Sequence, residues 1–286
     1  MPFPLTSRIP TGSHTDWCLL VGRTLWVANQ GDGTVSRLDL TTHQVVATIA
    51  VGLYPLGLAW DGSALWTTDR GANAVVRIDP ATNQVSLKIP VGADPISLIY
   101  AFGSLWVTNR NSGTVSRIDT SNNSVVATIP TGAQALGLSS DGHRIWVTND
   151  DISTNTSGSL TAIDPLSNSV VATVSGLNDP WFSTFDGNSI WVPSRRAGTL
   201  TRVDVNTFAV AQVVYVGPDQ VATAFDGTNV WAATYAGNSL VRIDPKTGEM
   251  IGFVPLPGGP SGFAVDGRSL WVTEYDGGGV QQVSIG

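Results

Sequence analysis

Three ionisable side chains near the two ends of the chain, His14, Asp16 and Glu274, could carry out acid–base chemistry together. A histidine titrates near neutral pH, so it can act as a general base or as a metal ligand, and a neighbouring carboxylate can orient it. The other two histidines, His43 and His143, fall in short turns between predicted strands. We therefore take His14, Asp16 and Glu274 as candidate catalytic residues.

A second group of acids could bind a metal ion. Asp94, Asp179 and Asp219 occupy the same place in three similar segments of the chain. Three carboxylates brought together repel one another unless they are protonated or bridged by a cation, and Ca²⁺ or Mg²⁺ suits oxygen ligands better than Zn²⁺ does. Aspartate near a strand end also commonly caps a turn through its own backbone, and this alternative is open. Nothing in the sequence indicates an organic cofactor.

Aromatic and cationic side chains at related positions could bind a substrate. Their faces would stack on an apolar or sugar ligand, and Arg195 or Tyr275 could hold a polar group. Two of them, Trp17 and Trp181, could equally be packing residues, and Arg195 could belong to an ordinary solvated pair with Arg196. The candidate substrate-binding residues are Trp17, Tyr54, Trp181, Arg195, Tyr235 and Tyr275.

A repeat of about 40 residues brings these positions together. It is marked by seven tryptophans: Trp26, Trp66, Trp106, Trp146, Trp191, Trp231 and Trp271. The one longer step, from Trp146 to Trp191, contains an insertion within 150–157. Self-similarity at a period of about 40 residues is typical of β-propellers. The repeat of about 40 residues therefore predicts the fold, and it also identifies the residues that depart from the repeat.

One repeat unit, residues 95–134, reads as four short strands. The expected strands are 95–100, 105–109, 114–119 and 124–129, and they are rich in Val, Ile, Thr and Trp. Clusters of Gly, Asn, Asp and Ser separate them, as in antiparallel hairpins, and Asp-Gly pairs such as Asp61-Gly62 favour the positive φ of a tight turn. Each unit thus predicts one four-stranded blade.

The ends of the chain predict how the ring closes. The last unit stops after its third strand, at 280–285, and the N-terminal segment "LTSRIPTG" resembles the fourth strand "VVATIPTG". We therefore expect an all-β, seven-bladed β-propeller forming a single domain over residues 1–286. Residues 4–10 should pair with 280–285 and so complete the last blade. Such pairing removes the exposed sheet edges that favour aggregation.

Strand direction assigns each loop to one face of the ring. The Asp-Gly turns fall on one face, which we call the bottom. Loops that lead into each inner strand, and loops between the second and third strands, fall on the top face. All the candidate residues above belong to these top loops or to the adjoining strand ends. The sequence therefore predicts a site at the top mouth of the central channel.

The motif "WVTNRNSGTVSRID…VVATIPTG" resembles the YVTN β-propeller repeat, and "DGxxLWVTE" at 266–274 is more loosely similar to the virginiamycin B (streptogramin) lyases. The resemblance implies a propeller fold. Proteins with similar propellers are often extracytoplasmic. The lyases carry their base just after the proline that opens an inner strand. None of the matching positions here is a histidine: Asp16, Leu56, Ile96, Leu136, Trp181, Val221 and Ser261.

Composition excludes several functions. The net charge of −7 argues against nucleic-acid binding. No apolar run approaches the roughly 18 residues of a membrane-spanning helix, and the sequence shows no signal peptide. Catalytic motifs such as GxSxG, HExxH and the P-loop are absent.

We expect a small-molecule or carbohydrate site at the top face, with a metal-assisted hydrolase (esterase- or lactonase-like) or a lyase as the leading hypothesis. A non-catalytic propeller that binds a protein partner, a surface or a carbohydrate is the alternative.

Overall fold

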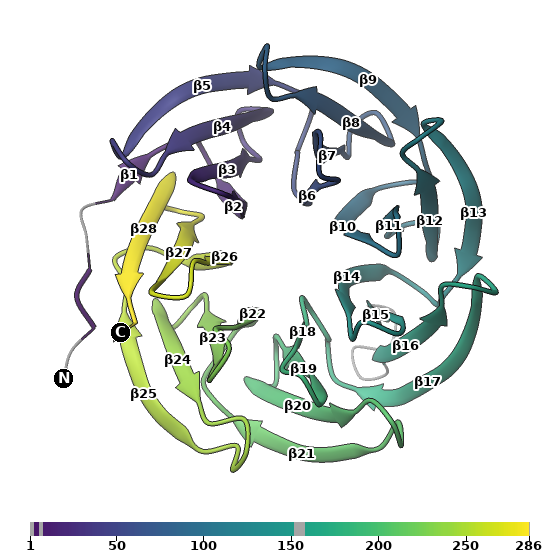
Figure 1. Cartoon of the computed structure of the whole chain (residues 1–286). Coiled ribbons are helices and arrows are strands. Elements are labelled where there is room, and N and C mark those ends of the chain that lie inside the picture. The colour runs from purple at the N-terminus through teal and green to yellow at the C-terminus, as the bar shows by residue number, and fades with distance from the viewer. Residues whose placement is uncertain (1–2, 6–7, 152–157, 286) are drawn as a thin grey trace.

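The computed structural model describes residues 3–5, 8–151 and 158–285, and in this part of the chain the structure is all β. The strands form seven four-stranded antiparallel sheets arranged as the blades of a closed ring (Figure 1). Blade 1 contains β2–β5, and the following blades take the next strands in chain order. Blade 7 combines β26, β27 and β28 with β1. The predicted seven-bladed propeller is therefore confirmed.

The strands of each blade run from the channel outward. The inner strands are β2 (Thr15–Val21), β6 (Leu58–Trp60), β10 (Pro95–Ala101), β14 (Ala135–Ser140), β18 (Thr184–Phe185), β22 (Gln220–Phe225) and β26 (Pro260–Val265). The second strands are β3 (Thr24–Asn29), β7 (Leu65–Asp69), β11 (Ser104–Asn109), β15 (Ile145–Asn149), β19 (Ser189–Ser194), β23 (Val230–Thr234) and β27 (Ser269–Glu274).

The outer half of each blade is equally regular. The third strands are β4 (Thr34–Asp39), β8 (Ala74–Asp79), β12 (Thr114–Asp119), β16 (Gly158–Asp164), β20 (Thr199–Asp204), β24 (Ser239–Ile243) and β28 (Gly279–Ser284). The outer strands are β5 (Gln44–Ala50), β9 (Gln84–Pro90), β13 (Ser124–Pro130), β17 (Ser169–Leu177), β21 (Val210–Tyr215), β25 (Met250–Pro255) and β1 (Ile9–Pro10).

The seven periodic tryptophans form the core between the blades, and each is no more than 1% exposed. In five blades the indole N–H donates to the aspartate of the Asp-Gly turn, as from Trp66 Nε1 to Asp61 Oδ2 at 2.7 Å. The same aspartate accepts backbone N–H groups of its own turn, for example that of Ala64. One side chain therefore fixes both the bottom hairpin and the tryptophan, which explains why the two residue types recur together.

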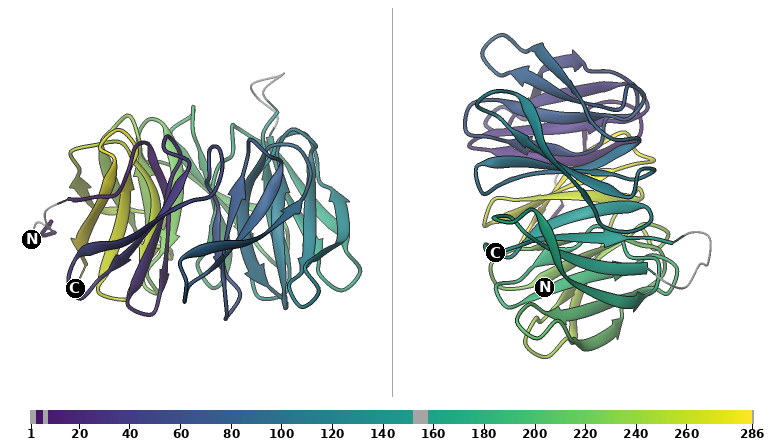
Figure 2. Two further views of the ribbon diagram at one scale, coloured as in Figure 1. Left: turned by 90° about the horizontal axis from the view of Figure 1, so that it is seen from above. Right: turned by 90° about the vertical axis from the view of Figure 1, so that its right-hand side faces the viewer.

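The N-terminal strand completes blade 7, as the sequence predicts. Ile9 pairs with Val280 and Pro10 with Gly279 in antiparallel register. Before β1 in the chain, Leu5 bridges to Val283, and the Ser284 N–H donates to Pro4 O at 3.1 Å. β1 and β28 lie side by side in Figure 1, and in Figure 2 the purple N-terminal segment lies next to the yellow C-terminal strands. The two termini thus share one sheet.

The second strand of one blade binds directly to the inner strand of the next across the blade boundary. Thr108 Oγ1 donates to Leu136 O at 2.7 Å, and Thr273 Oγ1 donates to Asp16 O at 2.7 Å. These hydrogen bonds hold the start of each inner strand at a fixed place around the channel.

No helix in the described part of the chain is long and apolar enough to cross a membrane.

Candidate ligand-binding site

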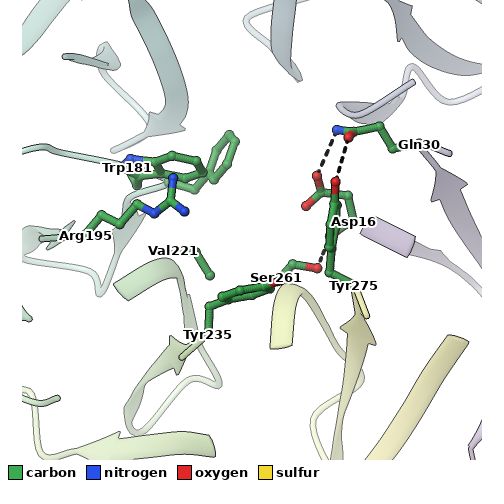
Figure 3. A pocket seen from close by; sticks show the side chains of 9 residues that line it. Asp16, Gln30, Trp181, Arg195, Val221, Tyr235, Ser261 and Tyr275 are labelled. Atoms are coloured by element: carbon green, nitrogen blue, oxygen red, sulfur yellow. Dashed lines mark hydrogen bonds between the residues drawn. The ribbon is translucent and has the colours of Figure 1, made fainter. Parts of the chain in front are cut away.

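A cavity of about 280 Å³ opens at the top mouth of the channel. Its lining residues come from blades 5, 6, 7 and 1, in that order around the ring (Figure 3). They are Trp181, Phe182 and Arg195; Val221 and Tyr235; Ser261 and Tyr275; and Asp16 and Gln30. The cavity is therefore placed to one side of the channel axis.

Among the described residues, blades 2, 3 and 4 supply none that lines the cavity, because aliphatic side chains fill their share of the channel. Leu56, Ile96 and Leu136 pack with Phe182 and Val221 in one buried cluster. These three aliphatic residues occupy the position that holds Asp16 in blade 1 and Ser261 in blade 7. The channel thus has an apolar plug with a polar opening above blades 7 and 1.

Asp16 is the ionisable group on the wall formed by blades 7 and 1. Gln30 Nε2 donates to Asp16 Oδ2 at 3.2 Å, and Tyr275 donates its hydroxyl proton to Gln30 Oε1 at 3.1 Å (Figure 3). The two bonds fix the amide of Gln30 so that its NH₂ group faces the carboxylate.

Burial raises the pKa of Asp16 to about 7, although the positive charge of Arg70 and a hydrogen bond from Ser261 lower it. Loss of hydration penalises the charged form of a carboxylic acid, which is why burial acts in this direction. Near neutral pH the group can therefore both accept and donate a proton.

Arg195 faces the cavity from the wall formed by blade 5. Its Nε donates to Asp219 Oδ1 at 2.6 Å, and its guanidinium carbon lies 4.6 Å from the centroid of the Trp181 ring. Trp181 in turn donates its indole N–H to Asp179 Oδ1 at 3.2 Å. A salt bridge and a cation–π contact thus hold the guanidinium in place.

Two tyrosines from successive blades form the remaining wall. Tyr235 and Tyr275 meet edge to face, with ring centroids 6.2 Å apart, and the Tyr235 hydroxyl donates to Asp276 at 2.9 Å. Both tyrosines have a raised pKa, first because of burial and second because of nearby acids, Asp276 for Tyr235 and Asp16 for Tyr275. They therefore enter the site as neutral phenols at physiological pH.

One rule relates these residues to the metal candidates. We call the residue after each second strand the loop residue, and the residue at the mouth before each inner strand the mouth residue. The loop residue of one blade contacts the mouth residue of the next at six junctions. The pairs are Arg70–Asp94, Arg110–Gln134, Asp150–Asp179, Arg195–Asp219, Tyr235–Gly259 and Tyr275–His14.

Each of the three aspartates has an arginine partner, which comes from the preceding blade for Asp94 and Asp219 and from the same blade for Asp179. Asp94 and Asp219 accept from Arg70 and Arg195, while Asp179 Oδ2 lies 3.4 Å from Arg196 Nε. Among the described residues, no group of three or more His, Cys, Asp or Glu side chains is placed to hold a metal ion. The geometry thus favours separate ion pairs with arginine over a cation shared by the three carboxylates, and metal binding stays a prediction.

The mouth residues also share an unusual backbone conformation. Six of the seven have a positive φ, from 45° at Asp179 to 57° at Tyr54 and Asp94. Asp and Asn tolerate this left-handed region better than most residues, because their short side chains hydrogen-bond locally. The alternative reading of these aspartates as turn residues therefore has a structural basis in their backbone.

The other two catalytic candidates do not line the cavity. His14 is exposed and its ring lies on Tyr275. Glu274 is fully buried, its two carboxylate oxygens accept no hydrogen bond among the described residues, and its Oε2 lies 4.0 Å from Arg8 Nη1. The structure therefore does not bring His14 and Glu274 to the cavity that Asp16 lines, and the catalytic roles of these residues stay a prediction. Side chains alternate along β27, so Glu274 points away from the cavity although Tyr275 reaches it.

Two substrate-binding candidates also lie outside the cavity. Tyr54 is 55% exposed at the mouth of blade 2. Trp17 packs into the channel core, with its ring centroid 4.9 Å from that of Phe182. Trp181, Arg195, Tyr235 and Tyr275 do line it, as expected. Most of the insertion expected at the top face, 152–157, lies outside the described residues.

Sequence reasoning missed four lining residues: Gln30, Phe182, Val221 and Ser261. Val221 and Ser261 occupy the position near the start of an inner strand that holds Leu or Ile in blades 2, 3 and 4. Phe182 directly follows this position in blade 5. A signal was available in Ser261, because a small polar residue at a position otherwise filled by aliphatic side chains leaves space. Gln30 gave no such signal, since its role depends on the facing tyrosine.

Comparison with known proteins supports the fold. No family model and no curated protein matches the chain. Among solved structures, a chain of hydrazine synthase from Kuenenia stuttgartiensis is 17% identical with a TM-score of 0.79, covering 97% of this chain and 96% of that one. Virginiamycin B lyase from Staphylococcus aureus is 14% identical with a TM-score of 0.81, covering 99% of each chain.

A catalytically inactive variant of the same lyase, solved with quinupristin, is 15% identical with a TM-score of 0.82 and 99% coverage of each chain. Identities this low establish a common fold and carry no residue-by-residue correspondence. The chain is therefore similar in fold to lyases that use a propeller.

Proposed function

We propose that the top-mouth cavity binds a small organic molecule and that Asp16 exchanges a proton with it, as in a lyase or a hydrolase. The observation that carries the proposal is the Asp16 carboxyl group itself. It faces a cavity with an apolar floor, it is oriented by Gln30, and its pKa is raised to about 7. A group with a pKa near the working pH is the most effective general base.

The rest of the cavity suits such a reaction. In a lyase reaction Asp16 would take a proton from a carbon next to a carbonyl group. The electron pair of that C–H bond would form the new double bond as the bond to the leaving group breaks, and the leaving group would recover a proton from Asp16 or water. Arg195, on the opposite wall (Figure 3), would stabilise negative charge that develops on the carbonyl oxygen.

The comparisons add support of a general kind. Virginiamycin B lyase has the same fold over its whole length, and one of its structures contains quinupristin. A propeller of this shape is therefore able to host a lyase site. In this chain the base would be an aspartate supplied by blade 1.

The test is a substrate screen with three proteins: the unaltered chain, Asp16→Asn and the control Asp32→Asn. Asp32 is an exposed aspartate in the loop after β3 of the same blade, where it accepts the Ser13 N–H at 2.7 Å. Esters, lactones and cyclic peptides would be offered. We expect Asp16→Asn to lower kcat by roughly 10²–10⁴ on any substrate found, with Asp32→Asn unaffected. Equal activity in all three proteins would exclude Asp16 as the proton-transfer group.

A further inference from the structure

Two opposite charges face each other across the cavity without forming an ion pair. Arg195 projects from blade 5, and Asp16 lies on the far wall beside Gln30 and Tyr275 (Figure 3). The guanidinium is paired with Asp219 at 2.6 Å. The two charged groups are thus separated by the space that a ligand would enter.

Each of these groups is held through atoms that a ligand would not need. Arg195 uses its Nε for Asp219 and one face of its guanidinium for Trp181, and Figure 3 shows its terminal nitrogens directed toward the cavity. Asp16 uses Oδ2 for Gln30, which Tyr275 fixes in turn. Ser261 also hydrogen-bonds to this carboxyl group, but a carboxylate can accept about four hydrogen bonds. Asp16 and the end of the guanidinium can therefore both still bind a ligand, and little side-chain freedom remains to be lost on binding.

The space between the charges is apolar and small. Phe182 and Val221 form its floor, and the rings of Trp181 and Tyr235 form its sides. A volume of about 280 Å³ is at the lower end of the range of about 300–1,000 Å³ that is usual for ligand pockets. The cavity is thus suited to a compact molecule with one flat or bulky apolar group.

We propose that the cavity binds a free amino acid with a large apolar side chain, its carboxylate on Arg195 and its ammonium group on Asp16. The side chain would rest on Phe182 and Val221 beside the Trp181 ring. The proposal rests on the proposed function for the location of the site, and it adds the class of ligand. A purely anionic ligand would cover the Asp16 carboxylate without a cationic group. A purely cationic ligand would leave the terminal N–H groups of Arg195 without an acceptor, although Asp219 still pairs with its Nε. Because charges covered without partners are costly, a ligand that carries both is favoured.

The experiment is isothermal titration calorimetry with three related probes. L-phenylalanine carries both charges, N-acetyl-L-phenylalanine lacks the cation, and L-phenylalanine amide lacks the anion. We expect L-phenylalanine to bind about tenfold or more tightly than either derivative, which is the usual worth of one charged hydrogen bond.

Two variants assign the charges to their residues. Arg195→Met should abolish the preference for L-phenylalanine over its amide, and Asp16→Asn should abolish the preference over the N-acetyl derivative. The matched control is Arg110→Met. Arg110 makes the same kind of contact, to Gln134 Oε1 at 3.0 Å, but it belongs to blade 3 and does not line the cavity. This control should keep both preferences, and thermal melting of all the variants checks that they are folded.

Several outcomes would overturn the ligand class. Equal affinity for the three probes would do so, as would preferences that persist in Arg195→Met and Asp16→Asn. If none of the probes bound while another small molecule bound in an Asp16-dependent way, the class would be wrong and the proposed function would stand. If L-phenylalanine bound as expected while Asp16→Asn left every turnover unchanged, the class would stand and the proton-transfer function would fail.

Discussion

The imidazole ring of His14 lies over the phenol ring of Tyr275, with centroids 4.8 Å apart and planes inclined by 32°. His14 therefore contacts the cavity through Tyr275 rather than directly. Tyr275 donates to Gln30, and Gln30 donates to Asp16. A chain of contacts thus connects the exposed histidine with the carboxylate that we place in the site.

His14→Ala should weaken ligand binding by only a few-fold, because it removes packing from Tyr275 and no charge from the cavity. Loss of a true general base costs roughly 10²–10⁴ in rate. Kinetic constants or ligand affinity for His14→Ala would decide between the two roles. Residue 14 has a φ of 49°, so His14→Gly, which accepts this conformation, is the control for backbone strain. A loss of activity above a hundredfold in both variants would make His14 catalytic.

Glu274→Gln should stabilise the protein at alkaline pH. Burial raises the pKa of Glu274, although Arg8 lowers it. A raised pKa means that the folded state holds the proton more tightly than the unfolded state. The stability from this group is therefore complete at pH 4 and is lost as pH rises through the folded pKa. We expect a melting temperature above that of the unaltered chain at pH 8, by roughly 2–4 °C for each kcal/mol recovered, and no difference at pH 4.

The control for this effect is Asp69→Asn in blade 2. Asp69 occupies the same place in the repeat as Glu274, and Lys88 occupies the same place as Arg8, but here the ion pair is close, at 2.8 Å. Removing the Asp69 charge should lower the melting temperature. A parallel response of the two variants would show that Arg8 and Glu274 form an equally effective pair in solution.

Deletion of residues 1–10 should destabilise blade 7 and expose the edge of β28. Ile9 and Pro10 pair with Val280 and Gly279, and Phe3 packs edge to face on Trp231 with centroids 5.4 Å apart. The deletion removes both contacts, so we expect a broader, lower melting transition and concentration-dependent association. Calorimetry and light scattering would measure these effects. Unchanged melting of a monomer would contradict the closure.

The fold could be predicted from the sequence because the tryptophan–aspartate hydrogen bond recurs in five of the seven blades and leaves a periodic pattern. Asp61 and Trp66 are five residues apart, so their contact is visible in a single repeat. The site is different. Asp16 and Tyr275 are joined through Gln30 across the closure of the ring, and no local spacing encodes that contact.

The position of Glu274 outside the cavity has a physical reason too. The sequence indicated that Glu274 lies near His14, because Glu274 ends the second strand of blade 7, which the N-terminal segment also completes. Alternation along the strand sends the side chain of Tyr275 to the cavity and that of Glu274 beneath the loop. The sequence predicted which blade each candidate residue belongs to. It did not predict whether the side chain at the strand end points toward the cavity or away from it.

Chelator should leave the melting temperature unchanged, and so should added Ca²⁺ or Mg²⁺. Asp94 and Asp219 already have guanidinium partners at 2.7 and 2.6 Å, and a cation would have to displace them. Melting curves with a chelator and with millimolar metal salts would test this expectation. A clear rise with one cation, abolished by Asp179→Asn, would restore the metal site as a functional feature.

The pH dependence of activity should report Asp16. If Asp16 is the base, kcat/KM should rise about tenfold per pH unit on the acid side and level off above about 7, the pKa to which burial raises this group. An ordinary carboxylate would level off near pH 4.

The stability of the folded protein should show the same group with the opposite trend. Because the folded state holds the Asp16 proton more tightly, its contribution is complete below the unfolded pKa and is lost as pH rises from about 4 to about 7. Asp16→Asn should flatten this part of the stability curve.

Arg70, whose charge favours the ionised form of Asp16, supplies an independent check. Arg70→Met should move the activity profile to higher pH, because it removes that favourable charge. A profile that did not move, or that moved to lower pH, would mean that another group titrates.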